Sequence, residues 1–236
     1  MTDLWEALSV ALSLVVGLDR ELVDIVGLSL RVSLTAVTMA ALIGLPLGAA
    51  LTVARFPGRG VCIVALNSLM GLPPVVVGLI VYLMLSRAGP LGVFGLLFTP
   101  AAMIIAQTVL ITPIIASLSR QITDDLWSEY REQLRSLGVS RRRAVTTLLW
   151  DGRIGLLTAV LAGFGRASAE VGAVMIVGGN IDNVTRVMTT TIAMETSKGN
   201  LALALGLGIV LIAISLIVNG LTFGLGVATR FEKAPA

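Results

Sequence analysis

Residues Val32–Ala54 read VSLTAVTMAALIGLPLGAALTVA, a run of 23 residues without Asp, Glu, Lys or Arg. A helix needs about 20 predominantly apolar residues to cross a bilayer, so this run is long enough to span one. Three further uncharged runs are also long enough: Gly60–Ser86, Ala88–Ser119 and Gly199–Thr229. A fifth stretch, residues 153–178, is equally apolar but contains Arg166 and Glu170, which predicts a span with a buried ion pair. The sequence therefore predicts an all-α integral membrane protein with five crossings.

The composition of the whole chain supports this fold class. Of 236 residues, 56% are hydrophobic and 13% are charged, against about 25% charged in an average soluble domain. Histidine is absent and Cys62 is the one cysteine, which excludes a Ser-His-Asp or Cys-His nucleophile, a His/Cys zinc site and an intrachain disulfide. The net charge of +3 is too small to indicate a nucleic-acid partner. A soluble enzyme is the class that these numbers disfavour most.

The N-terminal segment allows two interpretations. Ala7–Leu18 is uncharged over only 12 residues, and acidic rather than basic residues precede it, which argues against a cleaved signal peptide. The segment can form a helix that lies along the membrane interface, or it can be a sixth crossing. In the interfacial interpretation the buried stripe consists of Leu4, Trp5, Leu8, Leu12 and Val15.

Basic residues gather on one side of the predicted bundle. With five spans, 11 fall on one side and five on the other, so the richer side is expected to be cytoplasmic. The richer side holds Arg55, Arg59, Arg120, Arg131, Arg135, Arg141, Arg142, Arg143, Arg153, Arg230 and Lys233. Small residues recur at Gly44–Gly48 and Gly220–Gly224, a spacing that favours ordinary tight helix packing over a dedicated dimer motif.

The one long polar segment, residues 120–152, predicts two short helices. Thr123-Asp124-Asp125 is a helix start, and an apolar stripe of Leu126, Tyr130, Leu134 and Leu137 follows it. Gly138 is placed to end this helix in a left-handed conformation, and Ser140 to cap a second helix that runs through Trp150. Such a pair can dock a partner protein or lie on lipid headgroups; binding to DNA is the weakest option because the segment is tethered to a membrane.

Two features of the fourth span and the segment after it also leave alternatives open. Arg166 and Glu170, four residues apart, can line or gate an anion path, or they can lock the span against its neighbours. Gly178–Lys198 is polar and includes Thr189 and Thr190, whose hydroxyls can offer weak hydrogen bonds to a tetrahedral oxyanion. The alternative for this segment is a solvated loop on the outer side.

Several of these stretches resemble the permeases of ABC importers. Glu132-Gln133-Leu134, three residues and then Gly138, followed by Leu148-Leu149-Trp150-Asp151, is similar to the family's cytoplasmic loop, although Gln133, Leu134 and Asp151 replace two alanines and a proline of its pattern. Arg55–Arg59, which closes the first long span, and Leu72–Gly78 are similar to oxyanion permeases of the molybdate group. Gly165–Ile181, with the segments Thr185–Thr190 and Glu195–Gly199, is most similar to the tungstate branch.

The resemblance implies a type I importer permease fold, with residues 1–236 as one transmembrane domain and residues 120–152 as its cytoplasmic coupling loop. It implies contact with an ATPase through Glu129, Glu132, Leu134, Leu137, Gly138, Val139 and Arg141. It implies a translocation path or gate that includes Pro73, Pro74, Arg166, Ser168, Glu170, Thr189 and Thr190.

The implied partners are two ATPase subunits, a second copy of this permease, an extracytoplasmic oxyanion-binding protein and membrane lipid, without nucleic acid. No phosphate-binding loop occurs in the chain, so ATP and Mg²⁺ are expected on the ATPase and no cofactor or metal on this chain. Tungstate is the expected cargo, with molybdate, sulfate or phosphate as alternatives. An ATP-independent secondary anion transporter is the rival from another class, but only Glu170 is available to carry protons within the spans.

Overall fold

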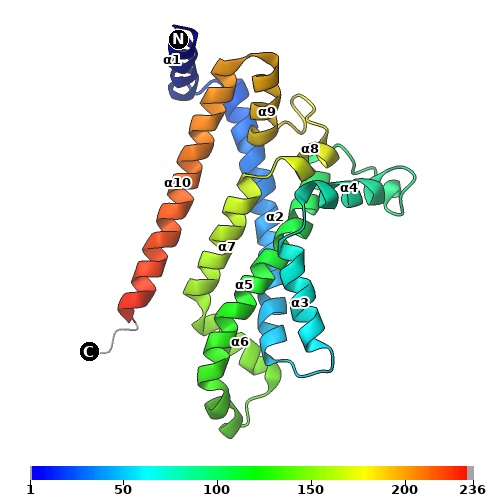
Figure 1. Cartoon of the computed structure of the whole chain (residues 1–236), viewed down its shortest axis with the longest axis vertical. Helices are drawn as coiled ribbons and strands as arrows, with labels where there is room; N and C mark the ends of the chain where they lie inside the picture. Colours follow the sequence, from blue (N-terminus) through cyan, green and yellow to red (C-terminus); the bar gives the residue numbers. More distant parts are fainter. Residues whose placement is uncertain (1, 233–236) are drawn as a thin grey trace. The chain divides into compact units, whose positions relative to one another are not determined.

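The structure, a computed structural model, describes residues 2–232, with the side chains of residues 5–224. Leu4, Arg230 and Lys233, which entered the predictions above, therefore have side chains outside the described set. The described chain consists of helices joined by turns (Figure 1). They are α1 (Thr2–Val16), α2 (Arg20–Val53), α3 (Arg59–Met70), α4 (Pro74–Leu85), η1 (Gly92–Phe94), α5 (Pro100–Ser136), α6 (Arg141–Asp151), α7 (Arg153–Ser168), α8 (Gly172–Gly178), α9 (Met188–Lys198) and α10 (Leu201–Glu232).

Three of these helices, α2, α5 and α10, are individually long and apolar enough to cross a membrane. The number of crossings rises to five if each of two bent helix pairs, α3 with α4 and α6 with α7, counts as one span. The all-α membrane fold is thus confirmed, and the predicted span over residues 60–86 is a bent pair of helices in the structure. The pair α3 and α4 bends by 101°, because Pro73 and Pro74 both lack an amide hydrogen and the residue before a proline is forced into extended backbone.

The predicted span over residues 153–178 is also interrupted. α7 ends at Ser168, and α8 begins only at Gly172. With 16 residues, α7 is about 24 Å long, which is short of the about 30 Å of a hydrocarbon core. Glu170 therefore lies in a break between two helices, not within one continuous helix.

The chain divides into two compact units, and four of the five boundaries between them fall inside α2, α5, α7 and α10, the fifth between α3 and α4. The first comprises Met1–Ala36, Pro73–Gln107 and Gly165–Val218. Its apolar core joins the beginning of α2 to α9 and α10 through Leu22, Ile25, Met188, Leu203 and Leu207. In the same unit α4 lies beside α8 (Figure 1). Their backbones approach so closely that a Cβ on Gly78 would lie 2.7 Å from the Cα of Ala173.

The N-terminal helix α1 packs its inner face on this core through Ala11, Leu14 and Val15, while Trp5 and Leu12 stay exposed. Its 15 residues reach about 22 Å, which is shorter than the hydrocarbon core. The helix is thus too short to cross alone, and its length favours the interfacial interpretation over a sixth crossing.

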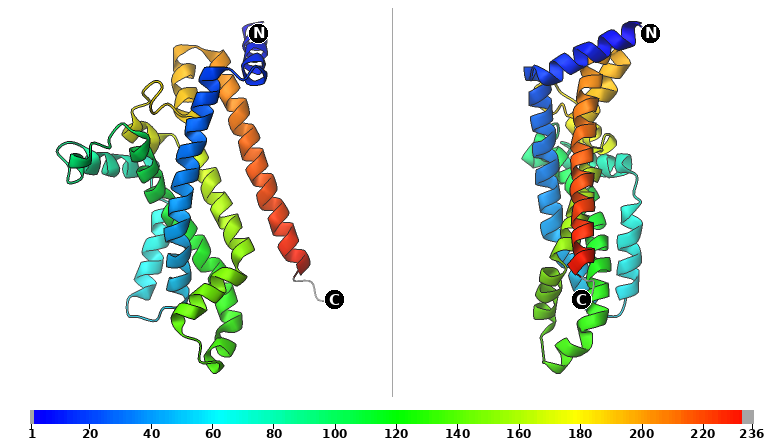
Figure 2. Two further views of the ribbon diagram at one scale, coloured as in Figure 1. Left: turned by 180° about the vertical axis from the view of Figure 1, so that it is seen from behind. Right: turned by 90° about the vertical axis from the view of Figure 1, so that its left-hand side faces the viewer.

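The second unit comprises Val37–Leu72, Thr108–Phe164 and Asn219–Ala236. Within it, α3 runs beside the second half of α5 (Figure 2), where the Ser117 hydroxyl donates to the Asn67 side chain at 2.6 Å. Gly44 and Gly48 of α2 face the backbone of α5 around Ala116, which supports the tight-packing interpretation of this glycine pair. Gly220 and Gly224 have no neighbour near their missing Cβ in the described part of the chain.

The end of α5 differs from the prediction. A helix start was expected at Thr123, yet α5 continues without interruption from Pro100 to Ser136. The side chain of Thr123 is fully buried and donates to the Ser119 carbonyl, one turn back, at 2.8 Å. Its oxygen also lies 2.9 Å from the hydroxyl of Thr52. A threonine whose hydroxyl bonds to the preceding turn and to a neighbouring helix is compatible with a helix interior. A threonine at this position therefore does not by itself identify a helix start.

Two glycines of α2 give a matched test of this packing. We expect Gly48→Ala to lower the free energy of unfolding by about 1–3 kcal/mol, the usual range for an overpacked contact. The added Cβ would lie 2.8 Å from both the Arg120 nitrogen and the Ser119 Cβ. Gly27→Ala in the same helix meets no atom within 4 Å and is expected to be neutral or stabilising by about 0.5–1 kcal/mol. Unfolding in detergent measures both, and equal effects would contradict the packing described here.

Candidate functional site

The break between α7 and α8 is organised by Glu170, which is only 3% exposed. Its Oε2 accepts a hydrogen bond from Arg166 Nη1 at 2.8 Å, and its Oε1 accepts one from the Ala173 amide at 3.1 Å. The predicted ion pair is thus confirmed. The carboxylate has a second task that the sequence did not reveal, because it also caps the first turn of α8. The side chain of Arg166 is 38% exposed, so Glu170 is the buried member of the pair.

The start of α9 is fastened to this break. The Thr189 hydroxyl donates to the Glu170 carbonyl at 2.7 Å, and the Met188 amide donates to the Ser29 hydroxyl of α2, also at 2.7 Å. The Thr190 hydroxyl donates to the Asn180 side chain at 2.8 Å. Each threonine hydroxyl has one hydrogen, and both are used within the chain. In this conformation neither hydroxyl therefore has a hydrogen left to donate to an oxyanion.

The expectation of a solvated loop over residues 178–198 is wrong for its second half. Residues 188–198 form helix α9, and three consecutive threonines, Thr189, Thr190 and Thr191, are buried in it. Burial is possible because each hydroxyl has a partner in the chain.

A small cavity adjoins the break, and its lining includes a buried glutamine that was not predicted from the sequence. Gln107 of α5 is 3% exposed, and its Nε2 donates to the Ala167 carbonyl at the end of α7 at 3.2 Å. Its Oε1 and the Ser168 Oγ have no hydrogen-bond partner among the described residues, and both residues line the cavity. The cavity offers about 10 Å³ to the centre of a water molecule, enough for about one water and too little for a tetrahedral oxyanion. It therefore suits a bridging water and not the cargo.

Pro73 and Pro74 lie close to the same break. Pro73 precedes α4 in extended backbone and Pro74 occupies its first turn, where a missing amide hydrogen costs nothing. The next residue, Val75, meets Gly172 at the start of α8, since a Cβ on Gly172 would lie 2.7 Å from Val75 Cγ2. The structure thus brings the two prolines into the neighbourhood of Glu170, while Thr190 points to Asn180 instead.

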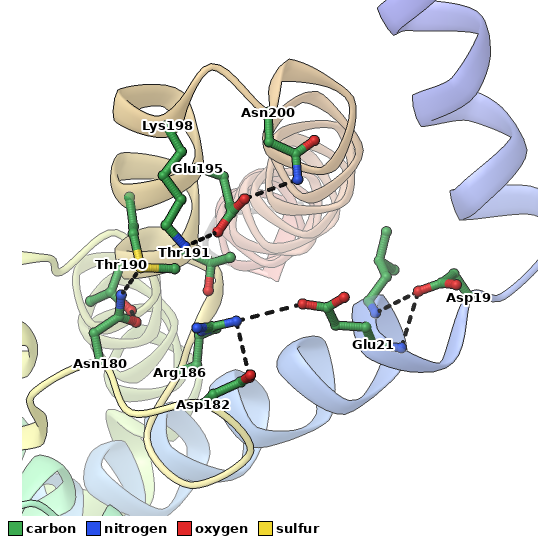
Figure 3. Close-up of polar contacts among 12 residues, drawn as sticks. Asp19, Glu21, Asn180, Asp182, Arg186, Thr190, Thr191, Glu195, Lys198 and Asn200 are labelled. Carbon is green, nitrogen blue, oxygen red and sulfur yellow. Dashed lines mark hydrogen bonds and ion pairs between the residues drawn. The ribbon is translucent and has the colours of Figure 1, made fainter.

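Polar contacts in the first unit fix α9 and the segment before it (Figure 3). Arg186 Nη1 pairs with Asp182 at 2.9 Å and with Glu21 of α2 at 3.6 Å. Glu195 is held between Lys198 at 3.0 Å and Asn200 at 2.9 Å, across the turn into α10. The hydrogen bond from Lys198 lowers the pKa of Glu195 below its ordinary value, although burial acts in the opposite direction. This contact therefore stabilises the fold at neutral pH, and its contribution is lost as the pH falls through the lowered pKa.

The end of α5 and the helix α6 form the second predicted site. Gly138 has φ +67°, and the Val139 amide bonds to the Leu134 carbonyl at 2.9 Å, so the predicted left-handed helix end is confirmed. Ser140 is confirmed as the cap of α6, because its hydroxyl accepts from the Arg143 amide at 3.5 Å.

The seven residues expected to contact an ATPase divide into two groups. Leu134 and Val139 are partly buried and pack on a core of Val53, Ala144 and Leu148. The apolar stripe was read as one surface, but Leu126, Tyr130 and Leu134 face this core and only Leu137 is exposed, at 77%. The exposed group, here called the α5–α6 tip, consists of Glu129, Glu132, Leu137, Gly138 and Arg141.

Comparisons with known proteins agree with this arrangement. The sequence profile of the family described as binding-protein-dependent transport system inner membrane component matches residues 40–226. A tungstate uptake system permease protein of Peptoclostridium acidaminophilum is 40% identical over 93% of this chain and 96% of its own length. A probable anion ABC transporter permease protein of Haloferax volcanii is 42% identical over 85% of this chain and 88% of its own. The molybdenum transport system permease protein of Escherichia coli is 27% identical over 81% and 89%.

Proposed function

The chain belongs to the family of binding-protein-dependent transport system inner membrane components, and on that basis we propose that it is the permease subunit of an ATP-driven importer that carries tungstate into the cytoplasm. The 40% identity with a tungstate uptake permease over 93% of the chain supports this cargo. Relatives named for molybdenum and sulfate transport are only 25–27% identical.

The proposed assembly contains two copies of this permease, two ATPase subunits and an extracytoplasmic binding protein for the oxyanion. Each of the two permease copies forms one membrane domain. The permease has no catalytic role, because ATP and Mg²⁺ bind to the ATPase. The α5–α6 tip and the C-terminus face the cytoplasm in this proposal. Leu137 is an exposed apolar side chain beside the left-handed turn at Gly138, and such a side chain suits a contact with a partner protein. The core of Val53, Ala144 and Leu148 packs behind the α5–α6 tip, so a force on the tip is transmitted to the helices.

The residues around the α7–α8 break are proposed to act as a gate and not as a cargo-binding site. Arg166 and Glu170 neutralise each other, the Thr189 hydroxyl is bound within the chain, and the adjoining cavity is too small for the anion. A transporter path needs contacts that are weak enough to release its cargo. A break in a helix, closed by a few polar contacts, is also the kind of element that a modest conformational change can rearrange.

Reconstitution tests this function directly. Proteoliposomes that contain the permease, its ATPase and the binding protein are expected to accumulate tungstate only with ATP, and to prefer tungstate over molybdate and sulfate. The matched control is the same preparation with a hydrolysis-deficient ATPase. Uptake by the permease without the ATPase would indicate a secondary transporter, and preference for molybdate or sulfate would contradict the proposed cargo.

A further inference from the structure

A second pocket lies within the second unit. It is formed by the end of α2, the turn that leads into α3 and one face of α5, and has a volume of about 370 Å³. Three arginines line it: Arg55, Arg59 and Arg131. Asp124 is the one acidic residue in its lining, and the aromatic rings of Phe56 and Trp127 complete the wall. We call this the arginine pocket.

Positive charge in the arginine pocket exceeds the negative charge. Asp124 lies 3.8 Å from Arg59 and 3.6 Å from Arg120, so its single charge is already shared between two arginines. Arg59 is further occupied by the Leu51 carbonyl, to which its Nε donates at 2.7 Å. Neither Arg55 nor Arg131 forms an ion pair with any residue that the structure describes. Two arginines that line this pocket therefore have no ion-pair partner among the described residues.

A third guanidinium increases the crowding. Arg135, one turn beyond Arg131 on α5, lies within electrostatic range of the positive charges of Arg55 and Arg131 and of the negative charge of Glu132. Like charges that lie close enough to perturb one another destabilise the fold unless an anion joins them. The arrangement is thus more favourable with a bound anion than without one.

The place of the pocket at the ends of two spans selects the class of anion. α2, a candidate span, ends at Val53, which lines the pocket, and α5 is also a candidate span. Aromatic rings such as those of Phe56 and Trp127 are typical of the boundary between hydrocarbon and water, where lipid phosphates lie. The planar guanidinium group matches the tetrahedral oxygens of a phosphate through paired hydrogen bonds. Basic pockets between transmembrane helices on the cytoplasmic side are typical headgroup sites.

We propose that the arginine pocket binds a tetrahedral oxyanion group through Arg55 and Arg131, supplied either by the phosphate of an anionic phospholipid or by a free inorganic oxyanion. The residues of this site are not among those proposed for the gate, and the proposal does not depend on the identity of the cargo. Phe56 and Trp127 then contact the glycerol and the first methylenes of a lipid, or cover one side of a free ion.

The pocket contains its own reporter, because the chain has three tryptophans and only Trp127 lines it. The full-length chain with Trp5→Phe and Trp150→Phe is purified in detergent, and its fluorescence is titrated with short-chain phosphatidylglycerol, short-chain phosphatidylcholine, sodium phosphate and sodium tungstate at constant ionic strength. We expect a saturable change that Arg55→Gln with Arg131→Gln weakens about 25-fold, from about fivefold per basic residue. Arg142→Gln with Arg143→Gln, two exposed arginines outside the pocket, is the matched control and should change the affinity less than twofold.

The outcomes separate the sources of the anion. A response to phosphatidylglycerol alone identifies a lipid site, and a response to phosphate or tungstate identifies a free-ion site; either supports the proposal. The charge-retaining pair Arg55→Lys with Arg131→Lys should recover part of the affinity, because the positive charges return without the paired guanidinium donors, and this recovery excludes misfolding as the cause of the loss. The absence of any saturable response, or an equal loss in the control pair, would overturn the proposal. Loss of the co-purifying ATPase in the glutamine pair, with unchanged titrations, would also overturn it and assign the arginines to a protein contact.

Discussion

Glu170→Ala is expected to lower the free energy of unfolding by about 3 kcal/mol, and to abolish transport. Removal of one member of a buried ion pair leaves the other charge without compensation, which costs about 3–5 kcal/mol when both members are fully buried. The lower end applies here because Arg166 is partly exposed. The Ala173 amide also loses its acceptor, and α8 loses its cap. Thermal unfolding in detergent and uptake by proteoliposomes measure the two effects.

Two further variants separate the roles of the Glu170 carboxylate. Glu170→Gln keeps an acceptor for the Ala173 amide and should lose less stability than Glu170→Ala. Exchange of the pair, Arg166→Glu with Glu170→Arg, should fail to restore either stability or transport, because an arginine cannot accept from that amide. Glu6→Gln, on the exposed face of α1, is the control for loss of a carboxylate. Normal assembly and transport in the exchanged variant would show that the ion pair alone matters.

Gly138→Val is expected to leave the bundle folded and to weaken the association with the ATPase about tenfold. At φ +67° a β-branched residue is strained by about 1–3 kcal/mol, and a tenfold change in affinity corresponds to about 1.4 kcal/mol. A Cβ at this position meets no atom within 4 Å, so the effect arises from the backbone and not from a clash. Co-purification of the ATPase from detergent extracts, together with the unfolding midpoint of the permease, tests both parts.

Gly138→Asn provides the matched control, because asparagine tolerates the left-handed conformation better than other residues with a side chain. It should keep most of the ATPase association. If valine and asparagine behave alike, the conformation of this turn is not what the ATPase contact requires. If Gly138→Val retains full association and transport, the α5–α6 tip is not the coupling element.

Local chemistry explains which parts of the fold the sequence could predict. Gly138 and Ser140 were predictable because a left-handed turn and a helix cap each depend on one residue type at one position. The pairing of Arg166 with Glu170 was predictable because two charges within an apolar run have few partners other than each other. The exclusion of a soluble fold followed from composition alone.

The predictions that failed depended on contacts between segments distant in the sequence. Thr123 resembled a helix start, but its hydroxyl bonds backwards along α5 and to Thr52. The threonines of α9 resembled a solvated loop, but they are buried with partners within the chain. Gln107 could have been predicted from the sequence as a residue with a specific partner, because it is the single amide side chain in the uncharged run Ala88–Ser119. A lone amide in an apolar span has to find a partner, and here it finds the end of α7.

The contact between α4 and α8 has a consequence for biogenesis. With 12 residues, α4 is about 18 Å long and cannot cross the hydrocarbon core by itself. Gly78 packs on Ala173, which the ribosome adds 95 residues later. At about 5–20 residues per second, this imposes an interval of about 5–20 s on every nascent chain. During that interval α4 has been synthesised but the residues that pack on it have not, so we expect this segment to reach its final depth only late in insertion.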